Sequence, residues 1–305
     1  MKTAWLFPGQ GAQQPGMGVA LAARSPRAAA LLEHAARAAG GVAVARVLAR
    51  GEPTMDRSSF LQPVLTAIAL GVAGELFAAG LRPALVAGHS LGEVAAWSAA
   101  GCISAEDAVA AASVRGRLME RAAQAHPGSM LALVAANQAA VAEALACGRA
   151  RGEIVLAARN SVDQWVLSGD AAALRAVAAA FPATHLPVQG PWHSPAMAAA
   201  ADPWLAALLA IPRARAQAGF VANRDGRLVA DEERIPHLLA GQLTHPVAWW
   251  ETMNTLGEAG VTCAVLVGPG KALRGLLRRH FGERLRLLLT EDESDLSSTI
   301  EVLRS

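Results

Sequence analysis

The sequence predicts an α/β fold, in which helices cover a parallel sheet and a smaller unit of the ferredoxin-like βαββαβ order is inserted. Over residues 1–125 short apolar runs alternate with helical patterns, as in sheets whose parallel strands are covered on both faces. The alternation breaks over residues 126–189, where two strands follow each other directly, and it resumes over 190–305. We therefore expect a discontinuous core of residues 1–125 and 190–305 around an inserted subdomain of residues 126–189.

The first strand is expected at Thr3–Phe7, which ends in Pro8-Gly9-Gln10-Gly11, a sequence that permits a tight turn. Ser25-Pro26 has the residue types that begin a helix, and Gly40-Gly41 ends it. A second helix is expected over Pro63–Ala79, because its apolar residues recur at offsets of three and four.

A buried strand at Ala84–Ala87 is expected to turn through Gly88-His89-Ser90-Leu91-Gly92 directly into an alanine-rich helix that ends near Gly101. Ser104, followed three residues later by Asp107, resembles a capping box and opens a further helix to about Ala125.

The inserted subdomain is expected to hold four strands and two helices. Its strands are expected at residues 130–134, 154–157, 165–167 and 184–186, and its helices at 139–146 and 171–181. Beyond it, the parallel sheet is expected to continue with strands near residues 220–222, 263–267 and 285–289.

Composition excludes several classes of protein. The 305 residues are 53% hydrophobic and 17% charged, which predicts a large core, and the net charge is only +2. Because no basic block is longer than Arg278-Arg279, we expect no nucleic-acid partner. The longest apolar stretch, Val64–Gly74, is shorter than the roughly 20 residues of a membrane span, and the N-terminus lacks a signal-peptide pattern, so we expect a cytoplasmic protein. Three widely spaced cysteines without a CxxC pair predict no disulfide and no metal site.

The strongest chemical signal is the G-x-S-x-G motif Gly88-His89-Ser90-Leu91-Gly92, between an expected strand and an expected helix. A nucleophile elbow needs this arrangement, because the glycines allow a sharp turn that exposes the serine hydroxyl. The Leu91 amide at the helix start can donate to an oxyanion. The alternative is a serine that only caps a helix, and the flanking strand and helix favour the nucleophile.

A serine nucleophile needs a base, and the chain has eight histidines. His193 belongs to the stiff loop Gly190-Pro191-Trp192-His193-Ser194-Pro195, just after the inserted subdomain. The two parts of the chain should form a cleft there, and clefts between subdomains commonly bind substrates. These residues alone leave a structural role for His193 equally open.

Short motifs in a fixed order extend over nearly the whole chain. They are Phe7-Pro8-Gly9-Gln10-Gly11, Gln62-Pro63, Gly88-His89-Ser90-Leu91-Gly92-Glu93, Arg115-Gly116 with Met119, Trp192-His193-Ser194-Pro195 with Met197, Gln242-Leu243-Thr244 with Pro246-Val247, and Gly268-Pro269-Gly270-Lys271. Together they resemble the malonyl-CoA:acyl carrier protein transacylases and the related acyltransferase domains of fatty-acid and polyketide synthases. The resemblance implies an α/β-hydrolase-like core with a ferredoxin-like insert, in agreement with the pattern above.

The resemblance also implies the catalytic roles. Ser90 would be the nucleophile and His193 its base, while the backbone amides of Gln10 and Leu91 would form the oxyanion hole. Gln242 would orient His193 through its backbone carbonyl, in place of the acid of a Ser-His-Asp triad. This substitution fits a sequence with no obvious third acid.

Substrate contacts follow from the same resemblance. Arg115 would bind the free carboxylate of malonate, since a guanidinium is planar and stays charged; an exposed helix arginine is the alternative. Gln62 and Asn160 would line the pocket. Trp192 stands where these enzymes generally have Phe, and its larger ring should leave less room beside the acyl α-carbon, which favours malonyl over methylmalonyl.

The implied reaction is a ping-pong transfer of malonyl from coenzyme A to the phosphopantetheine thiol of an acyl carrier protein, with no metal and no permanently bound cofactor. Arg274, Arg278 and Arg279 are candidate contacts for the carrier, or a solvated helix face. Fatty-acid synthesis, a polyketide pathway served in trans and a malonate decarboxylase subunit all stay open. A serine thioesterase or hydrolase and a non-catalytic docking subunit are the alternatives from other classes.

Overall fold

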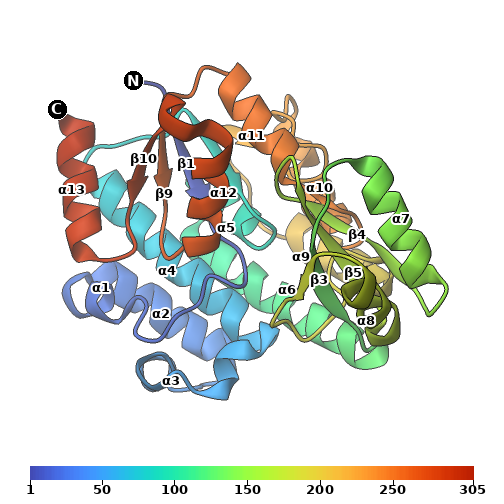
Figure 1. The fold of residues 1–305 in the computed structure, drawn as a ribbon. Helices are drawn as coiled ribbons and strands as arrows, with labels where there is room; N and C mark the ends of the chain where they lie inside the picture. Colours follow the sequence, from blue (N-terminus) through green and yellow to red (C-terminus); the bar gives the residue numbers. More distant parts are fainter.

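Two five-stranded sheets organise the computed structural model, which describes residues 1–305 (Figure 1). The larger sheet has the order β10-β9-β1-β2-β7, and all its strands are parallel. Its strands are β1 (Thr3–Phe7), β2 (Leu85–Gly88), β7 (Gly219–Val221), β9 (Cys263–Leu266) and β10 (Arg286–Leu289). Both ends of the chain build this sheet, because β1 lies between β2 and β9.

The smaller sheet contains the predicted βαββαβ unit. It consists of β3 (Ser129–Val134), α7 (Gln138–Arg149), β4 (Ile154–Arg159), β5 (Gln164–Gly169), α8 (Ala171–Ala180) and β6 (Ala183–His185). The strand order β6-β3-β5-β4 is antiparallel throughout, as in a ferredoxin-like unit. The predicted fold class is thus confirmed, while the boundaries at residues 126 and 189 stay a prediction.

A fifth strand of the small sheet comes from the C-terminal part of the chain. The two-residue strand β8 (Val247–Ala248) pairs in parallel with β4 and leads into α11 (Trp249–Glu258). Two residues are too short to show an alternating pattern, so this strand could not be predicted from the sequence. Through β8 the small sheet is joined to the core beside the candidate site.

Two helix starts predicted from capping residues are confirmed. The Ser25 hydroxyl accepts a hydrogen bond from the Ala28 amide at 3.2 Å at the start of α2 (Pro26–Ala38). The Ser104 hydroxyl accepts one from the Asp107 amide at 3.0 Å at the start of α6 (Ala105–Ala125). In Figure 1, α6 extends from the core toward the small sheet.

The helix expected at Pro63–Ala79 begins earlier, as α4 (Ser58–Ala78), with Pro63 inside it. Pro63 has no N–H, so α4 lacks the one backbone hydrogen bond that residue 63 would donate to the Ser59 carbonyl. By length and composition α4 is apolar enough to cross a membrane, unlike the shorter stretch seen in the sequence. However, 89% of its most apolar window is buried inside the protein, so α4 is the central helix of the core.

The remaining helices belong to the layers around the two sheets or pack on other helices. They are α1 (Val19–Arg24), α3 (Val44–Arg50), α5 (Gly92–Ala99), α9 (Ala198–Leu209), α10 (Ile235–Gln242), α12 (Lys271–Phe281) and α13 (Glu293–Arg304), with short 3-10 turns at Pro53–Asp56, Pro195–Met197, Glu232–Arg234 and Gly282–Arg284. Strands β2 and β9 are buried along their whole length, as a sheet covered on both faces requires. The inserted unit has its own small apolar core around Leu131, Leu167 and Leu174.

Candidate active site

Ser90 lies at the tip of a sharp turn between β2 and α5. Its φ is +52°, a conformation that a residue with a side chain rarely adopts and that occurs in strained functional turns. A Cβ at Gly92 would lie 2.0 Å from the Phe7 carbonyl oxygen, so only glycine fits where the turn passes β1. The turn therefore has the geometry of a nucleophile elbow.

His193 also has a positive φ, +59°, and is buried beside Ser90. Its Nε2 lies 2.8 Å from the Ser90 hydroxyl, and its Nδ1 lies 2.9 Å from the Gln242 backbone carbonyl. Because a carbonyl can only accept, Nδ1 carries the proton and Nε2 is left to accept the proton of Ser90. No carboxylate contacts the imidazole, so a neutral carbonyl orients this base.

The electrostatics of the site keep His193 neutral. Burial, together with the smaller effect of the nearby charge of Arg115, lowers its pKa from the ordinary value of 6.5 to about 3. Neutral imidazole is the form that can accept the Ser90 proton.

We therefore expect the rate of Ser90 acylation to stay level from pH 7 down to about pH 5. Rapid-quench measurement of acyl-enzyme formation checks this, and a tenfold fall per pH unit below 6.5 would contradict it.

Two backbone amides in and next to the elbow have no hydrogen-bond acceptor. In the elbow the amides of His89, Ser90, Gly92 and Glu93 all donate hydrogen bonds, whereas the Leu91 amide has no acceptor. The Gln10 amide, in the loop after β1, also has none. A Cβ at Gly9 would lie 2.3 Å from the His89 carbonyl oxygen, which shows how closely this loop approaches the elbow. Unpaired backbone amides from adjacent loops are the kind of donor that an oxyanion hole uses.

Arg115 reaches the nucleophile from α6 and is only 2% exposed, so it is not a surface arginine. Its Nη2 donates to the Ser90 hydroxyl at 3.2 Å and to Gln242 Oε1 at 2.7 Å, and its Nη1 donates to Gln62 Oε1 at 3.0 Å. Burial lowers its pKa to about 10, and the charge of Glu93 opposes that shift. Arg115 is therefore a charged group at any neutral pH, within reach of whatever is bound to Ser90.

The remaining predicted residues lie further from the nucleophile. Asn160 Oδ1 lies 3.0 Å from His89 Nε2, which places Asn160 next to the elbow but not in contact with Ser90. The side chain of Gln10 accepts a hydrogen bond from the Ser58 hydroxyl at 3.3 Å.

Of the arginines considered for carrier docking, Arg274 pairs with Glu291 at 3.6 Å and Arg279 pairs with Asp163, so only Arg278 has no ion pair.

Trp192 is 5% exposed and packs back against its own loop. A Cβ at Gly190 would lie 2.4 Å from Trp192 Cη2 and 2.8 Å from the Ala123 Cβ, so the absence of a side chain at Gly190 makes room for the indole.

We expect Gly190→Ala to lower the free energy of unfolding by about 1–3 kcal/mol, because the indole must move. Denaturant titration measures this. Gly275→Ala in α12 is the control, since no atom lies within 4 Å of the added Cβ and alanine should stabilise that helix by about 0.5–1 kcal/mol. If Gly190→Ala proved as stable as the unmodified chain, the packing argument would be wrong.

Glu93 and Asn223 are buried beside Ser90 at 1% and 0% exposure, and neither was predicted to have a role in the site. Glu93 directly follows the G-x-S-x-G motif, and a carboxylate in the first turn of an apolar helix was a usable signal. Asn223 carried no signal, because its position depends on β7 lying next to β2.

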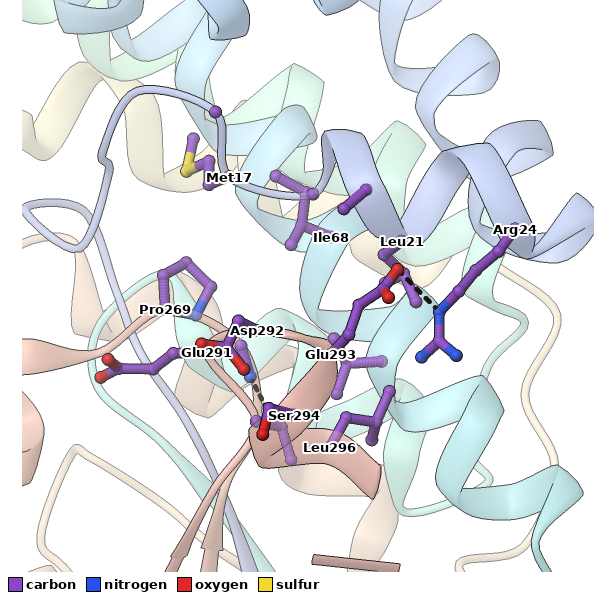
Figure 2. Close-up of a pocket in the computed structure, with 16 residues that line it drawn as sticks. Met17, Leu21, Arg24, Ile68, Pro269, Glu291, Asp292, Glu293, Ser294 and Leu296 are labelled. Atoms are coloured by element: carbon purple, nitrogen blue, oxygen red, sulfur yellow. Dashed lines mark hydrogen bonds and ion pairs between the residues drawn. The ribbon is translucent and has the colours of Figure 1, made fainter. Parts of the chain in front are cut away.

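A hollow of about 360 Å³ lies away from Ser90, between α1, α4 and the start of α13 (Figure 2). Apolar side chains, among them Ile68 and Leu296, line part of it together with Glu291, Asp292 and Glu293. Arg24 pairs with Glu293 at 3.1 Å across its edge. No histidine or cysteine lines it, whereas Ser90 has a histidine within hydrogen-bond distance, so the candidate active site is the Ser90 centre.

Residues 4–269 match the family model of the acyl transferase domain. The chain belongs to this acyl transferase family. Within the family, it is 36% identical to the malonyl CoA-acyl carrier protein transacylase of Synechocystis, over 92% of this chain and 94% of that protein. The crystal structure of the acyl-carrier-protein S-malonyltransferase from Bartonella henselae has a TM-score of 0.92 and 31% identity, and both chains are covered completely.

A third relative in the acyl transferase family was solved with a partner. It is a malonyl-transacylase in complex with its type II polyketide synthase acyl carrier protein, with a TM-score of 0.90 and 29% identity, over 99% of this chain and 100% of that one. The resemblance to malonyl-CoA:acyl carrier protein transacylases that the motifs indicated is confirmed.

Proposed function

We propose that this protein is an acyl-carrier-protein S-malonyltransferase, which moves malonyl from malonyl-CoA to the phosphopantetheine thiol of an acyl carrier protein. The observation that carries the proposal is the Arg115 guanidinium 3.2 Å from the Ser90 hydroxyl. An acyl group esterified to Ser90 therefore lies next to a buried positive charge. This charge suits an acyl group, such as malonyl, that has a free carboxylate besides the ester carbonyl. The names of the near full-length relatives support the same activity.

The geometry supports a two-step mechanism. His193 Nε2 takes the Ser90 proton as the oxygen attacks the malonyl thioester carbonyl, and the Leu91 and Gln10 amides stabilise the oxyanion. The C–S bond then breaks, and His193 returns its proton to the leaving coenzyme A thiolate. In the second step the carrier thiol gives its proton to His193 and attacks the malonyl-Ser90 ester. The ester C–O bond breaks, and Ser90 recovers its proton.

The test is to mix the protein with malonyl-CoA and a phosphopantetheinylated carrier and to follow both products. We expect malonyl-carrier to form and a malonylated Ser90 peptide to accumulate when the carrier is left out. Rapid release of free malonate without carrier loading would instead indicate a thioesterase. A chain that forms no malonyl-Ser90 at all would be a non-catalytic docking subunit.

The proposed activity could serve more than one biosynthetic pathway. The relatives named above include transacylases and one polyketide partner complex, so we propose fatty-acid biosynthesis as the main assignment and a polyketide pathway or a malonate decarboxylase as the alternatives. A competition assay with several acyl-CoAs and several carriers distinguishes them. We also propose a cytoplasmic location, which fractionation of cells that express the chain would test.

A further inference from the structure

We propose that Asn223 and Glu93 are positioning residues, which hold the nucleophile elbow and the base-orienting Gln242 in their reactive arrangement. The inference rests on the proposed function of the Ser90 centre and deepens it. Both residues are almost completely buried, and both act through their neighbours.

Asn223 bridges the two sides of the elbow with one side chain. Its Oδ1 accepts a hydrogen bond from the Ser90 amide at 2.7 Å, and its Nδ2 donates to the Gly88 carbonyl at 2.6 Å. The residue lies just after β7, the neighbour of β2 in the large sheet, so a second strand of the sheet supports the turn.

This bridge matters because Ser90 has a left-handed backbone conformation. Such a conformation persists only where its surroundings fix it. The bridge also occupies the Ser90 amide, so that the next amide, that of Leu91, is the one left free toward the reacting carbonyl. Without Asn223 the Ser90 amide and the Gly88 carbonyl would both lose a partner in a buried site.

Glu93 connects this bridge to the base. One of its carboxylate oxygens accepts from the Asn223 backbone amide at 2.7 Å, and the other accepts from Gln242 Nε2. Gln242 Nε2 also donates to the Ser90 carbonyl at 2.9 Å, while its own backbone carbonyl holds His193. A single carboxylate therefore fixes both the elbow and the residue that orients the base.

The same connection links Glu93 to Arg115. Arg115 donates to Gln242 Oε1 at 2.7 Å, and Gln242 in turn donates to Glu93, so one amide lies between the guanidinium and the carboxyl group. Burial raises the pKa of Glu93 to about 8, while the hydrogen bonds from Asn223 and Gln242 and the charge of Arg115 oppose this shift. The contribution of Glu93 to the site is therefore its hydrogen bonds to Asn223 and Gln242.

The test compares Asn223→Ala and Glu93→Gln with the unmodified enzyme. We expect the rate of malonyl-Ser90 formation in single-turnover rapid-quench experiments to fall by about 100-fold in each, because small misplacements of reacting groups have effects of this size. Each substitution is also made in a Ser90→Ala background, where the Kd for malonyl-CoA should change by less than about twofold. If the two residues only maintained the fold, their substitution would weaken malonyl-CoA binding as well as slow malonyl-Ser90 formation.

Asn137→Ala is the matched control. Asn137 also accepts a backbone hydrogen bond, from Ala140 at 3.0 Å, but at the exposed start of α7. We expect its loss to lower the melting temperature and to leave the rate unchanged. A rate within twofold of the unmodified enzyme in Asn223→Ala and Glu93→Gln would overturn the proposal. So would an equal loss of rate and of malonyl-CoA binding.

A serine-directed fluorophosphonate separates this proposal from the proposed function. If the unmodified chain reacts with the probe at Ser90 but transfers no malonyl, the proposed function is wrong. The positioning role is then judged by the rate of Ser90 labelling, which should fall in Asn223→Ala and Glu93→Gln and stay unchanged in Asn137→Ala. Equal labelling rates in all four proteins would overturn it.

Discussion

Ser90→Ala should eliminate malonyl transfer, with kcat reduced by about 10⁶-fold, as observed when the serine of a serine-histidine unit is removed. The hydroxyl oxygen forms the bond to the malonyl carbonyl, and no other nucleophile contacts His193 Nε2 in the structure. The assay is malonyl loading of the carrier, together with intact-mass measurement of the protein after incubation with malonyl-CoA. The variant should show no malonyl adduct.

Binding is the internal control for Ser90→Ala. Arg115 keeps its hydrogen bonds to Gln62 and Gln242, and the amides of Gln10 and Leu91 do not depend on the Ser90 hydroxyl. Malonyl-CoA should therefore still bind to the variant with an affinity near that of the unmodified enzyme. A malonyl adduct on another residue, such as one of the cysteines, would refute Ser90 as the nucleophile.

The parts of the site that could be predicted from the sequence are those formed by residues close together in the chain. The motif residues Gly88, Ser90 and Gly92 lie within five residues, and a Cβ at Gly88 would lie 1.9 Å from the Gly92 carbonyl carbon, so this part of the steric requirement is contained in the motif itself. The capping of α6 by Ser104 is likewise decided within one helical turn. Such features can be identified before any strand order is known.

The contacts that complete the site are not local. Glu93, Asn223 and Gln242 come from three distant stretches of chain and meet only because β7 lies beside β2 and α10 ends below the elbow. The sequence indicated that a parallel sheet exists but gave no order for its strands, so it could not bring these three side chains together. The strand β8 could not be predicted for a different reason, because its two residues are too few to show a periodic pattern.

Arg115→Ala should separate malonyl transfer from acetyl transfer. Truncating one partner of a buried, hydrogen-bonded charge pair costs about 2–5 kcal/mol, which corresponds to roughly a 30- to 5,000-fold loss. Malonyl, with its free carboxylate, should lose this amount in kcat/KM. Acetyl has no carboxylate and should lose only the smaller part that comes from disturbing Gln62 and Gln242. The measurement is kcat/KM for malonyl-CoA and acetyl-CoA with the same carrier.

Two further variants decide what the guanidinium contributes. Arg115→Lys keeps the charge but loses the planar fork that donates to Gln62, Gln242 and Ser90 together, so it should recover only part of the malonyl preference. Arg117→Ala is the matched control two residues further along α6, because Arg117 donates to the Ala38 carbonyl and to Ser113 instead. It should leave the malonyl-to-acetyl ratio unchanged. If Arg115→Ala reduced both acyl groups equally, the buried arginine would support the architecture of the site and not the substrate carboxylate.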